Sequence, residues 1–225
     1  MPNDLLTYFE KRFATEKMPA KKEPGPFITI SRETGCNGTA IARDLAKALS
    51  AYGKTWHFVN KEVLEESART LNLDESKINY VFDSKAKTHI DEILGALSNR
   101  YYKNDKMVRK AISMVLCHFA QEGNMIIVGR AGVAVTRDMA RGLHLRFVAP
   151  YDWRVNSLNR RKAFENINTG LFIKEHDLKK KKLIEQFYGK KFDEIYFDLT
   201  LNTEAFSRNQ IISIVIEAMK LRSLI

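Results

Sequence analysis

Five short apolar runs, most of them separated from the next by a segment with helical spacing, constrain the fold of this chain more than any other feature. Runs of this length suit strands that are buried on both faces, because such strands need no alternation of polar residues. Strands that alternate with helices predict an α/β fold, a parallel sheet with helices on both faces. The five predicted strands are Phe27–Ile30, Trp56–Val59, Met125–Val128, Leu143–Val148 and Tyr196–Leu201.

Helices are predicted between these runs and at both ends of the chain. After the first strand, the apolar residues Ile41, Leu45 and Leu49 fall on one helical face, and Gly53 provides a stop. A helix over residues 4–14 precedes a segment with three prolines, so residues 1–25 are expected to be an appended helix and linker before a domain at 26–225. The other predicted helices cover 61–71, 152–164, 171–187 and 211–221, with two or three more within 74–122.

Composition favours a cytoplasmic protein with an anionic partner. No window approaches eighteen consecutive apolar residues, the first residues lack the apolar core of a secretory signal, and Cys36 and Cys117 have no metal-ligand spacing. The net charge is +10, which suggests nucleotides, nucleic acid or an anionic surface as partners. Residues 154–191 carry 11 Lys or Arg against 4 acids, a net +7. This block is either a solvated helical face or a lid that handles phosphate groups.

The turn after the first strand has the composition of a phosphate-binding loop. Residues 35–38 read Gly-Cys-Asn-Gly, and a helix is predicted to start near Gly38. Glycines let several backbone N–H groups point into one concavity, and the helix N-terminus adds its positive dipole end. The loop lacks the lysine of the G-x-x-x-x-G-K-S/T motif, because Gly38 stands at that position and Thr39 follows. On local sequence alone, a strand–turn–helix without a ligand remains an alternative.

Five segments, in order and spacing, resemble the cytidylate-kinase-like family of P-loop kinases over roughly residues 26–216. The Ser-Arg-Glu-x-Gly start at Ser31 and the Ile-Val-Gly-Arg segment ending at Arg130 carry most of the resemblance. The segments are ITISRETGCNGTAIARDLAKAL, FVNKEVLEESA, NMIIVGRAGVAVTRD, LHLRFVAPYDWRV and YFDLTLNTEAFS.

The resemblance implies a P-loop NTPase fold with a five-stranded parallel sheet, a helical monophosphate-binding insert at about 74–122 and a basic lid at about 154–187. It also implies transfer of the γ-phosphoryl group from ATP, with Mg²⁺, to CMP, dCMP or a related small acceptor. Two departures stand out. Val128-Gly129-Arg130-Ala131 replaces the Asp-Gly-Arg-Asp of cytidylate kinases, and Asp177-Leu178-Lys179-Lys180 replaces Asp-x-x-Arg.

The candidate site residues follow from the loop, from the charge pattern and from the resemblance. Guanidinium groups pair bidentately with phosphate, so arginines near the loop can stand in for the missing lysine. The expected catalytic residues are Arg32, Arg130, Arg160 and Arg161, and Arg154 also lies at the predicted lid entry. The residues expected to bind the donor phosphates are Gly35, Cys36, Asn37, Gly38 and Thr39. The residues expected to bind the substrate are Lys61, Glu62, Arg130, Asp177 and Lys180.

Several of these residues have a structural alternative. Arg32 could form an ion pair with Glu33, and Thr39 could cap the helix instead of contacting magnesium. Cys36 could be a reactive thiol at a helix N-terminus, but a small loop filler is the favoured interpretation. Glu62 could serve only the dipole of its helix. The five histidines show no metal spacing, so no protein-held metal cluster is expected.

Three functions are compatible with the sequence. The first is a working nucleotide kinase, and the second is a nucleotide-binding regulatory protein on the same fold, because Gly38, Val128 and Ala131 replace catalytic groups. The third is a nucleic-acid binder that uses the basic block at 154–191. This third function is disfavoured, because the block lacks regularly interleaved aromatic residues for base stacking.

Overall fold

A computed structural model gives the fold of the chain and describes residues 24–60, 113, 116–117 and 119–225. Residues 24–60 and 119–225 form one compact unit. The helix predicted over 4–14, the helix over 61–71 and nearly all of the insert expected at 74–122 lie outside the described residues, as do Lys61 and Glu62.

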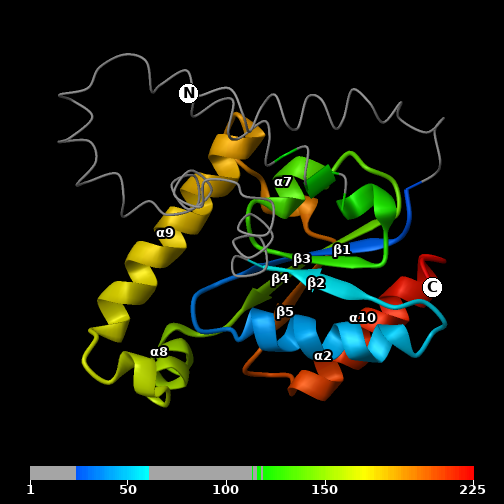
Figure 1. Ribbon diagram of the computed structural model, residues 1–225. Coiled ribbons are helices and arrows are strands. Elements are labelled where there is room, and N and C mark those ends of the chain that lie inside the picture. The colour runs from blue at the N-terminus through cyan, green and yellow to red at the C-terminus, as the bar shows by residue number, and fades with distance from the viewer. Residues whose placement is uncertain (1–23, 61–112, 114–115, 118) are drawn as a thin grey trace, which may run out of the picture. The chain divides into compact units, whose positions relative to one another are not determined.

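The unit is built on a five-stranded sheet in which every pairing is parallel. The strands are β1 (Phe27–Arg32), β2 (His57–Val59), β3 (Met125–Val128), β4 (Gly142–Val148) and β5 (Leu199–Asn202). Their order in the sheet is β2-β3-β1-β4-β5, so β1 lies at the centre with β3 on one side and β4 on the other (Figure 1). The predicted five-stranded α/β fold is therefore confirmed.

Helices cover both faces of this sheet. On one face, α2 (Gly38–Ser50) and α10 (Arg208–Leu221) pack side by side, and on the other lie α7 (Gly132–Thr136) and α9 (Thr169–Tyr188) (Figure 1). The helical spacing expected in α2 is observed, since Ile41, Leu45 and Leu49 are buried in the main core cluster. Burial of these apolar side chains is the main source of stability in such a layered fold.

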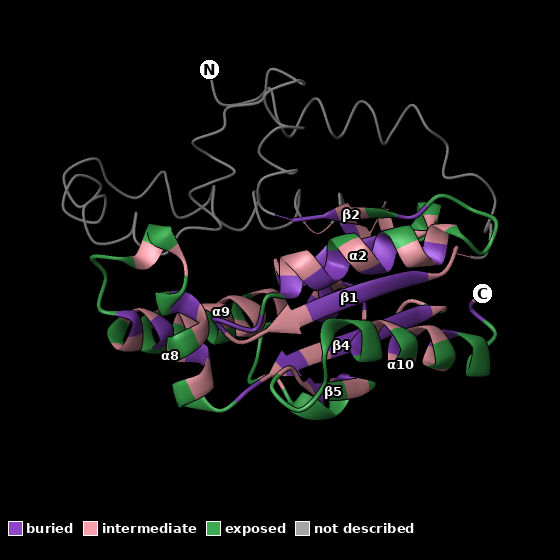
Figure 2. Cartoon of the chain, turned by 90° about the horizontal axis from the view of Figure 1, so that it is seen from below, coloured by how far each residue is buried: buried purple, intermediate pink, exposed green. Residues whose placement is uncertain are grey.

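The central strand β1 is buried along most of its length and becomes partly exposed at its carboxyl end. Phe27 to Ile30 are almost fully buried between β3 and β4, whereas Ser31 and Arg32 are partly exposed (Figure 2). The chain leaves β3 on one side of β1 and returns as β4 on the other. Ligands of open parallel sheets bind outside the carboxyl ends of the strands at such a reversal of strand order. The fold therefore directs attention to the residues after Arg32 and after Val128.

The remaining described helices are α8 (Tyr151–Asn159), the 3₁₀ turn η1 (Lys162–Phe164) and the 3₁₀ turn η2 (Glu194–Tyr196). The single helix expected over 152–164 is thus divided, because Arg161 has extended backbone angles.

None of the helices in the described part of the chain combines the length and the apolarity needed to cross a membrane.

The last predicted strand was placed too early. The run Tyr196–Leu201 begins in η2, and β5 starts only at Leu199. The Asp193 side chain accepts a hydrogen bond from the Ile195 N–H, which starts a 3₁₀ turn where the apolar pattern indicated a strand. The short helix α7 was not predicted.

Candidate phosphate-binding site

The turn between β1 and α2 has a backbone that only certain residues can adopt. Gly35 has φ of 101°, and Asn37, directly before α2, lies in the left-handed region with φ of 52°. A Cβ atom on Gly35 would lie 2.9 Å from the Arg154 Cβ atom, so a glycine is required by space as well as by conformation. Asparagine is among the few other residues that tolerate the left-handed region. The sequence thus shapes a tight turn that delivers the chain into a helix.

The first turn of α2 offers backbone donors. Among the described residues, no carbonyl or side chain accepts a hydrogen bond from the N–H groups of Gly38, Thr39 or Ala40. These groups lie at the positive end of the helix dipole, where anions are stabilised. The predicted donor-binding segment at 35–39 therefore has the backbone arrangement that a phosphate group requires.

The Arg32 side chain runs alongside the position where a P-loop lysine would stand. A Cβ atom on Gly38 would lie 3.0 Å from the Arg32 Cγ atom and 3.2 Å from its Cδ atom. At the other end of the side chain, a Cβ atom on Gly129 would lie 2.0 Å from the Arg32 Nη1 atom. The side chain thus passes Gly38 with its methylene groups and places its guanidinium against Gly129.

A pocket opens at the carboxyl ends of β1 and β3, with a volume of about 340 Å³ including its open mouth. Three cationic residues, Arg32, Arg130 and Lys180, line it, together with an apolar wall. The complete lining is Thr29, Ile30, Ser31, Arg32, Gly129, Arg130, Ala131, Gly132, Val133, Lys180, Leu183 and Ile184. The structure thus brings together three predicted site residues that are 98 and 50 positions apart in sequence (32 to 130, and 130 to 180).

Lys180 is perturbed by this environment. Burial and the nearby positive charge of Arg32 lower the pKa of the Lys180 ammonium from 10.5 to about 8, although Asp177 opposes the change. Its Nζ atom donates a hydrogen bond of 2.6 Å to the Thr34 hydroxyl and lies 3.4 Å from an Asp177 carboxylate oxygen. Like charges held this close favour an anion between them.

Arg130 occupies a strained part of the backbone. Arg130 and Ala131 have φ of 54° and 55°, directly after Gly129 at 74° and before α7. Three successive left-handed residues are costly for side chains other than glycine and persist only where the surroundings impose them. The Gly129 N–H donates to the Ile30 carbonyl at 2.8 Å, which ties this turn to the central strand. The strained turn therefore positions Arg130 in the lining of the pocket.

Asp177 is a structural partner of the loop. Its Oδ1 atom accepts hydrogen bonds from both the N–H and the hydroxyl of Thr34, each at 2.7 Å. Burial disfavours the charged carboxylate, but the bonds from Thr34 and the charge of Lys180 outweigh burial and hold the pKa of Asp177 below its usual value. The predicted Asp177–Lys180 pair thus contacts the loop through Thr34, a residue that the sequence did not single out.

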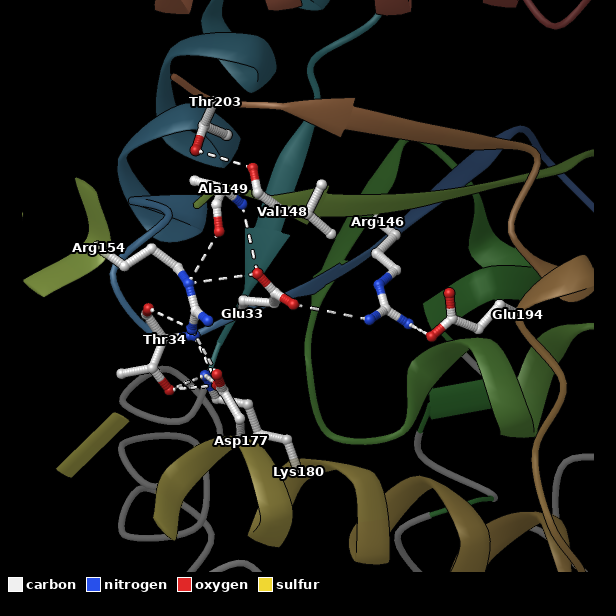
Figure 3. Close-up of polar contacts among 10 residues, drawn as sticks. All are labelled: Glu33, Thr34, Arg146, Val148, Ala149, Arg154, Asp177, Lys180, Glu194 and Thr203. Atoms are coloured by element: carbon white, nitrogen blue, oxygen red, sulfur yellow. Dashed lines mark hydrogen bonds and ion pairs between the residues drawn. The ribbon is translucent and has the colours of Figure 1, made fainter. Parts of the chain in front are cut away.

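Arg154, expected to be a lid cation, points its guanidinium toward Glu33, Thr34 and Asp177 (Figure 3). Its side chain is only 10% exposed. It donates to the Ala149 carbonyl at 3.0 Å and to the Thr34 carbonyl at 3.3 Å, and it pairs with Asp177 at 2.5 Å and Glu33 at 3.3 Å. These contacts engage the guanidinium with protein groups on several sides, so Arg154 holds the loop in place.

Glu33, the partner considered for Arg32, completes this network. Its carboxylate pairs with Arg154 at 3.3 Å and lies 3.9 Å from Arg146, and it accepts a hydrogen bond from the Ala149 N–H at 3.3 Å (Figure 3). Arg146 in turn pairs with Glu194. The acid of the Ser-Arg-Glu segment therefore fastens the loop to the end of β4.

The two lid arginines differ in placement. The Arg161 guanidinium donates to the Asn37 side-chain oxygen and so lies beside the start of α2. Arg160 is exposed at the end of α8, and no hydrogen bond of its side chain to the loop is found among the described residues. Ser157, which the sequence did not indicate, donates to the Gly35 carbonyl at 3.0 Å.

Cys36 and Thr39 have different environments in the loop. The Cys36 side chain is fully buried, and burial raises the pKa of its thiol, which favours the loop-filler interpretation over a reactive thiol. Thr39 lies in the first turn of α2, half-buried. Among the described residues, no group of three His, Cys, Asp or Glu side chains could hold a metal ion. A hydroxyl such as that of Thr39, together with substrate phosphates, is the kind of ligand set that Mg²⁺ accepts.

A parallel sheet with the order β2-β3-β1-β4-β5, whose central strand leads through a glycine-containing turn into a helix N-terminus, has the arrangement of a P-loop NTPase fold, and solved structures agree. An uncharacterized protein from Eubacterium ventriosum ATCC 27560 superposes with a TM-score of 0.58 at 18% identity, covering 87% of this chain and 98% of that one. Shikimate kinase from Acinetobacter baumannii in complex with shikimate has a TM-score of 0.50 at 14% identity, covering 90% and 97%. Shikimate kinase from Bacteroides thetaiotaomicron has a TM-score of 0.50 at 13% identity, covering 88% and 98%.

The chain belongs to the cytidylate kinase-like family, whose sequence profile matches residues 27–205. This confirms the family that the five segments indicated. No curated protein sequence matches the chain. Similarity to the solved structures, at under 20% identity, establishes the fold, and the chemistry has to be argued from this chain's own residues.

Proposed function

We propose that this protein is a nucleotide kinase that transfers the γ-phosphoryl group of ATP to CMP, dCMP or a related small acceptor. The observation that carries the proposal is the meeting of two features at one edge of the sheet. The N–H groups of Gly38, Thr39 and Ala40 form an anion-binding helix start, and Arg32, Arg130 and Lys180 line the adjacent pocket. Family membership supports the same class of reaction.

The reaction requires positioning more than covalent chemistry from the protein. An oxygen of the acceptor phosphate forms a bond to the γ-phosphorus of ATP, while the bond from that phosphorus to the β,γ-bridging oxygen breaks and ADP leaves with the electron pair. Backbone amides at the start of α2 would hold the donor phosphates, and Arg32 and Lys180 would neutralise the migrating charge. Arg130, at the end of β3, would hold the acceptor phosphate in line with the donor.

Lid residues and magnesium complete the proposal. Arg161, which contacts Asn37, would add charge on the donor side, and Arg160 would follow when the part of the predicted lid between Arg154 and Asp177 closes and excludes water. Magnesium, held by the Thr39 hydroxyl and the phosphates, would supply further charge neutralisation. Lys61 and Glu62 remain predicted substrate residues from the family resemblance.

Steady-state assays of ADP formation test the proposal directly. The full-length chain is incubated with ATP and each of the common nucleoside monophosphates, and CMP or dCMP is expected to give the highest kcat/KM. Arg130→Ala is expected to reduce kcat/KM by about 10³-fold or more, because a cation that stabilises the transferring phosphate has an effect of that order. Arg208→Ala, which removes a half-exposed pair with Asp44, is the control and is expected to retain activity.

The second candidate is a nucleotide-binding regulatory protein without turnover. It is favoured by Val128 and Ala131, which provide no carboxylate at the end of β3, and by Gly38 in place of lysine. ATP binding without ADP formation from any acceptor would establish this candidate and reject the kinase.

A further inference from the structure

We infer that the cation of the phosphate loop has moved from position 38 to position 32, and that Gly38 is a glycine because the Arg32 side chain occupies the space beside it. The inference rests on the proposed binding of a nucleoside di- or triphosphate at the start of α2. It goes beyond that function by explaining why position 38 must stay small for Arg32 to bind the phosphate chain.

The steric part of the argument concerns Gly38. A Cβ atom on Gly38 would lie 3.0 to 3.4 Å from the Cγ, Cδ and Cβ atoms of Arg32, closer than ordinary van der Waals contact. Gly38 has no left-handed φ, so its backbone alone does not require a glycine. Glycine is also a poor helix former, so its presence at the start of α2 has a cost in stability. The position of Arg32 accounts for that choice.

The same side chain explains the tight contact at Gly129. A Cβ atom there would lie 2.0 Å from Arg32 Nη1 and 3.0 Å from Cζ. The guanidinium is thereby held at the pocket that Arg130 and Lys180 also line. Its planar fork can bind two oxygens of one phosphate, whereas a lysine at position 38 would offer a single point charge.

The charges in the pocket also support Arg32 as the cation that binds phosphate. The charge of Arg32 acts on Lys180, which reaches the pocket from α9, so two cations line the same pocket. A phosphate group between them would turn this repulsion into two attractions. In this site, Arg32 on β1 and Lys180 on α9 therefore take the place of the single lysine of a P-loop.

A double-mutant cycle on ADP affinity tests the inference. Isothermal titration gives the Kd for ADP of the wild type, Gly38→Ala, Arg32→Ala and the double variant. Arg32→Ala is expected to weaken ADP binding by about 10- to 100-fold, since it removes a charge-assisted contact. Gly38→Ala is expected to weaken binding by displacing Arg32, and to have no further effect in the Arg32→Ala background, because contacting residues do not act additively.

A reciprocal variant and a matched glycine pair make the test sharper. Arg32→Ala combined with Gly38→Lys restores a P-loop lysine and is expected to recover ADP affinity, whereas Gly38→Lys alone is expected to bind poorly. Gly129→Ala and Gly53→Ala both substitute a glycine with positive φ, but a Cβ on Gly53 would meet nothing within 4 Å. Both should lose stability in urea unfolding, and only Gly129→Ala should lose ADP affinity.

The outcomes separate this inference from the proposed function. If the wild type does not bind ADP, both are overturned. If the wild type binds ADP and Arg32→Ala binds it equally well, or the Gly38→Ala and Arg32→Ala effects simply add, the inference is overturned and the kinase proposal stands. A cooperative urea transition of Gly38→Ala that lies well above the conditions of the titration ensures that weaker binding does not reflect unfolding.

Discussion

At the scale of single residues, Lys180 is the group most sensitive to its surroundings. It contacts Asp177 and the Thr34 hydroxyl, and the positive charge of Arg32 acts on it. Its pKa of about 8 means that its charge changes within a pH range accessible to experiment. An ammonium that loses its proton near pH 8 gives anion binding a pH dependence that an unperturbed lysine would not give.

We therefore predict that ADP affinity falls as pH rises through about 8. Lys180 is protonated below its pKa, so the favourable charge is present at pH 7 and lost by pH 9.5. The phosphate itself contributes little to this change, because its second pKa is about 6 and its ionisation is nearly complete by pH 7. Titration calorimetry with the wild type between pH 6.5 and 9.5 measures the effect.

Two variants at position 180 serve as controls for this prediction. Lys180→Arg keeps its charge throughout the range and is expected to remove most of the decline. Lys180→Met is expected to bind ADP weakly at every pH. A wild-type affinity that stays constant to pH 9.5, or an equally steep decline in Lys180→Arg, would contradict the role assigned to Lys180.

At the scale of elements, one buried arginine joins four parts of the fold. Arg154 extends from α8 to the carbonyl of Ala149 after β4, to Glu33 and Thr34 of the loop, and to Asp177 on α9. Removing one partner from a buried ion pair leaves the other charge without compensation. The helices around the loop therefore depend on Arg154 for their mutual placement.

Arg154→Met is predicted to lower the free energy of unfolding by about 3 kcal/mol, because it leaves the partly buried Asp177 and Glu33 carboxylates without their shared cation. Arg154→Lys is expected to lie between the wild type and Arg154→Met, because it keeps the charge and loses the fork. Arg208→Ala, at a pair whose side chains are 51% and 34% exposed, is expected to cost less than about 1 kcal/mol. Equilibrium urea unfolding measures the free energy of unfolding of all three variants. If Arg154→Met and Arg208→Ala lose equal amounts, Arg154 does not join these parts of the fold as described.

The elements show where sequence-based prediction works and where it stops. Long apolar or amphipathic segments such as β1, α2 and α9 were predicted to within a few residues, because their patterns are local. The five-residue helix α7 was missed, because its Gly-Val-Ala-Val-Thr sequence contains β-branched residues and follows the left-handed turn at Arg130 and Ala131. The bond between Thr34 and Asp177 joins residues 143 positions apart, so nothing in the local sequence indicates it.

Individual site residues divide in the same way. Arg32, Arg130 and Lys180 could be selected because they follow strands or match a family motif, and the fold brings them to one pocket. The pattern could not reveal that Arg154 pairs with the protein groups around the loop, since a lid cation would use the same residue type at the same spacing. The burial of Arg154 and its ion pairs depend on the whole fold, and they show which of the two placements occurs.

At the scale of the whole molecule, topology and charge act together. The order β2-β3-β1-β4-β5 places the carboxyl end of β1 where the chain changes direction, and the cations of the pocket lie at that point. A net charge of +10 attracts polyanions in general, so nucleic acid also has to be considered. A nucleotide in a defined pocket and a nucleic acid on a diffuse surface differ in how their binding responds to salt.

We predict that ATP stabilises the protein in 150 mM salt and that double-stranded DNA does not. At a ligand concentration 100 times its Kd, binding to the native state adds about 2.7 kcal/mol. For a chain of this length, that corresponds to a rise in Tm of roughly 5–10 °C. Arg32→Ala should show a much smaller rise at the same ATP concentration, whereas Arg208→Ala should respond as the wild type does.

Scanning calorimetry with ATP, with CMP, and with a DNA duplex at equal phosphate concentration distinguishes the alternatives. If binding occurs at the start of α2 and the adjacent pocket, the ATP-induced rise in Tm should persist as salt increases, because partly buried charge pairs are screened weakly. Non-specific binding through the basic block at 154–191 would instead produce a DNA-induced rise at low salt that disappears at higher salt. If DNA raises the Tm as much as ATP does at 150 mM salt, and still does so in Arg32→Ala, the protein binds nucleic acid through its positive charge and the prediction is wrong.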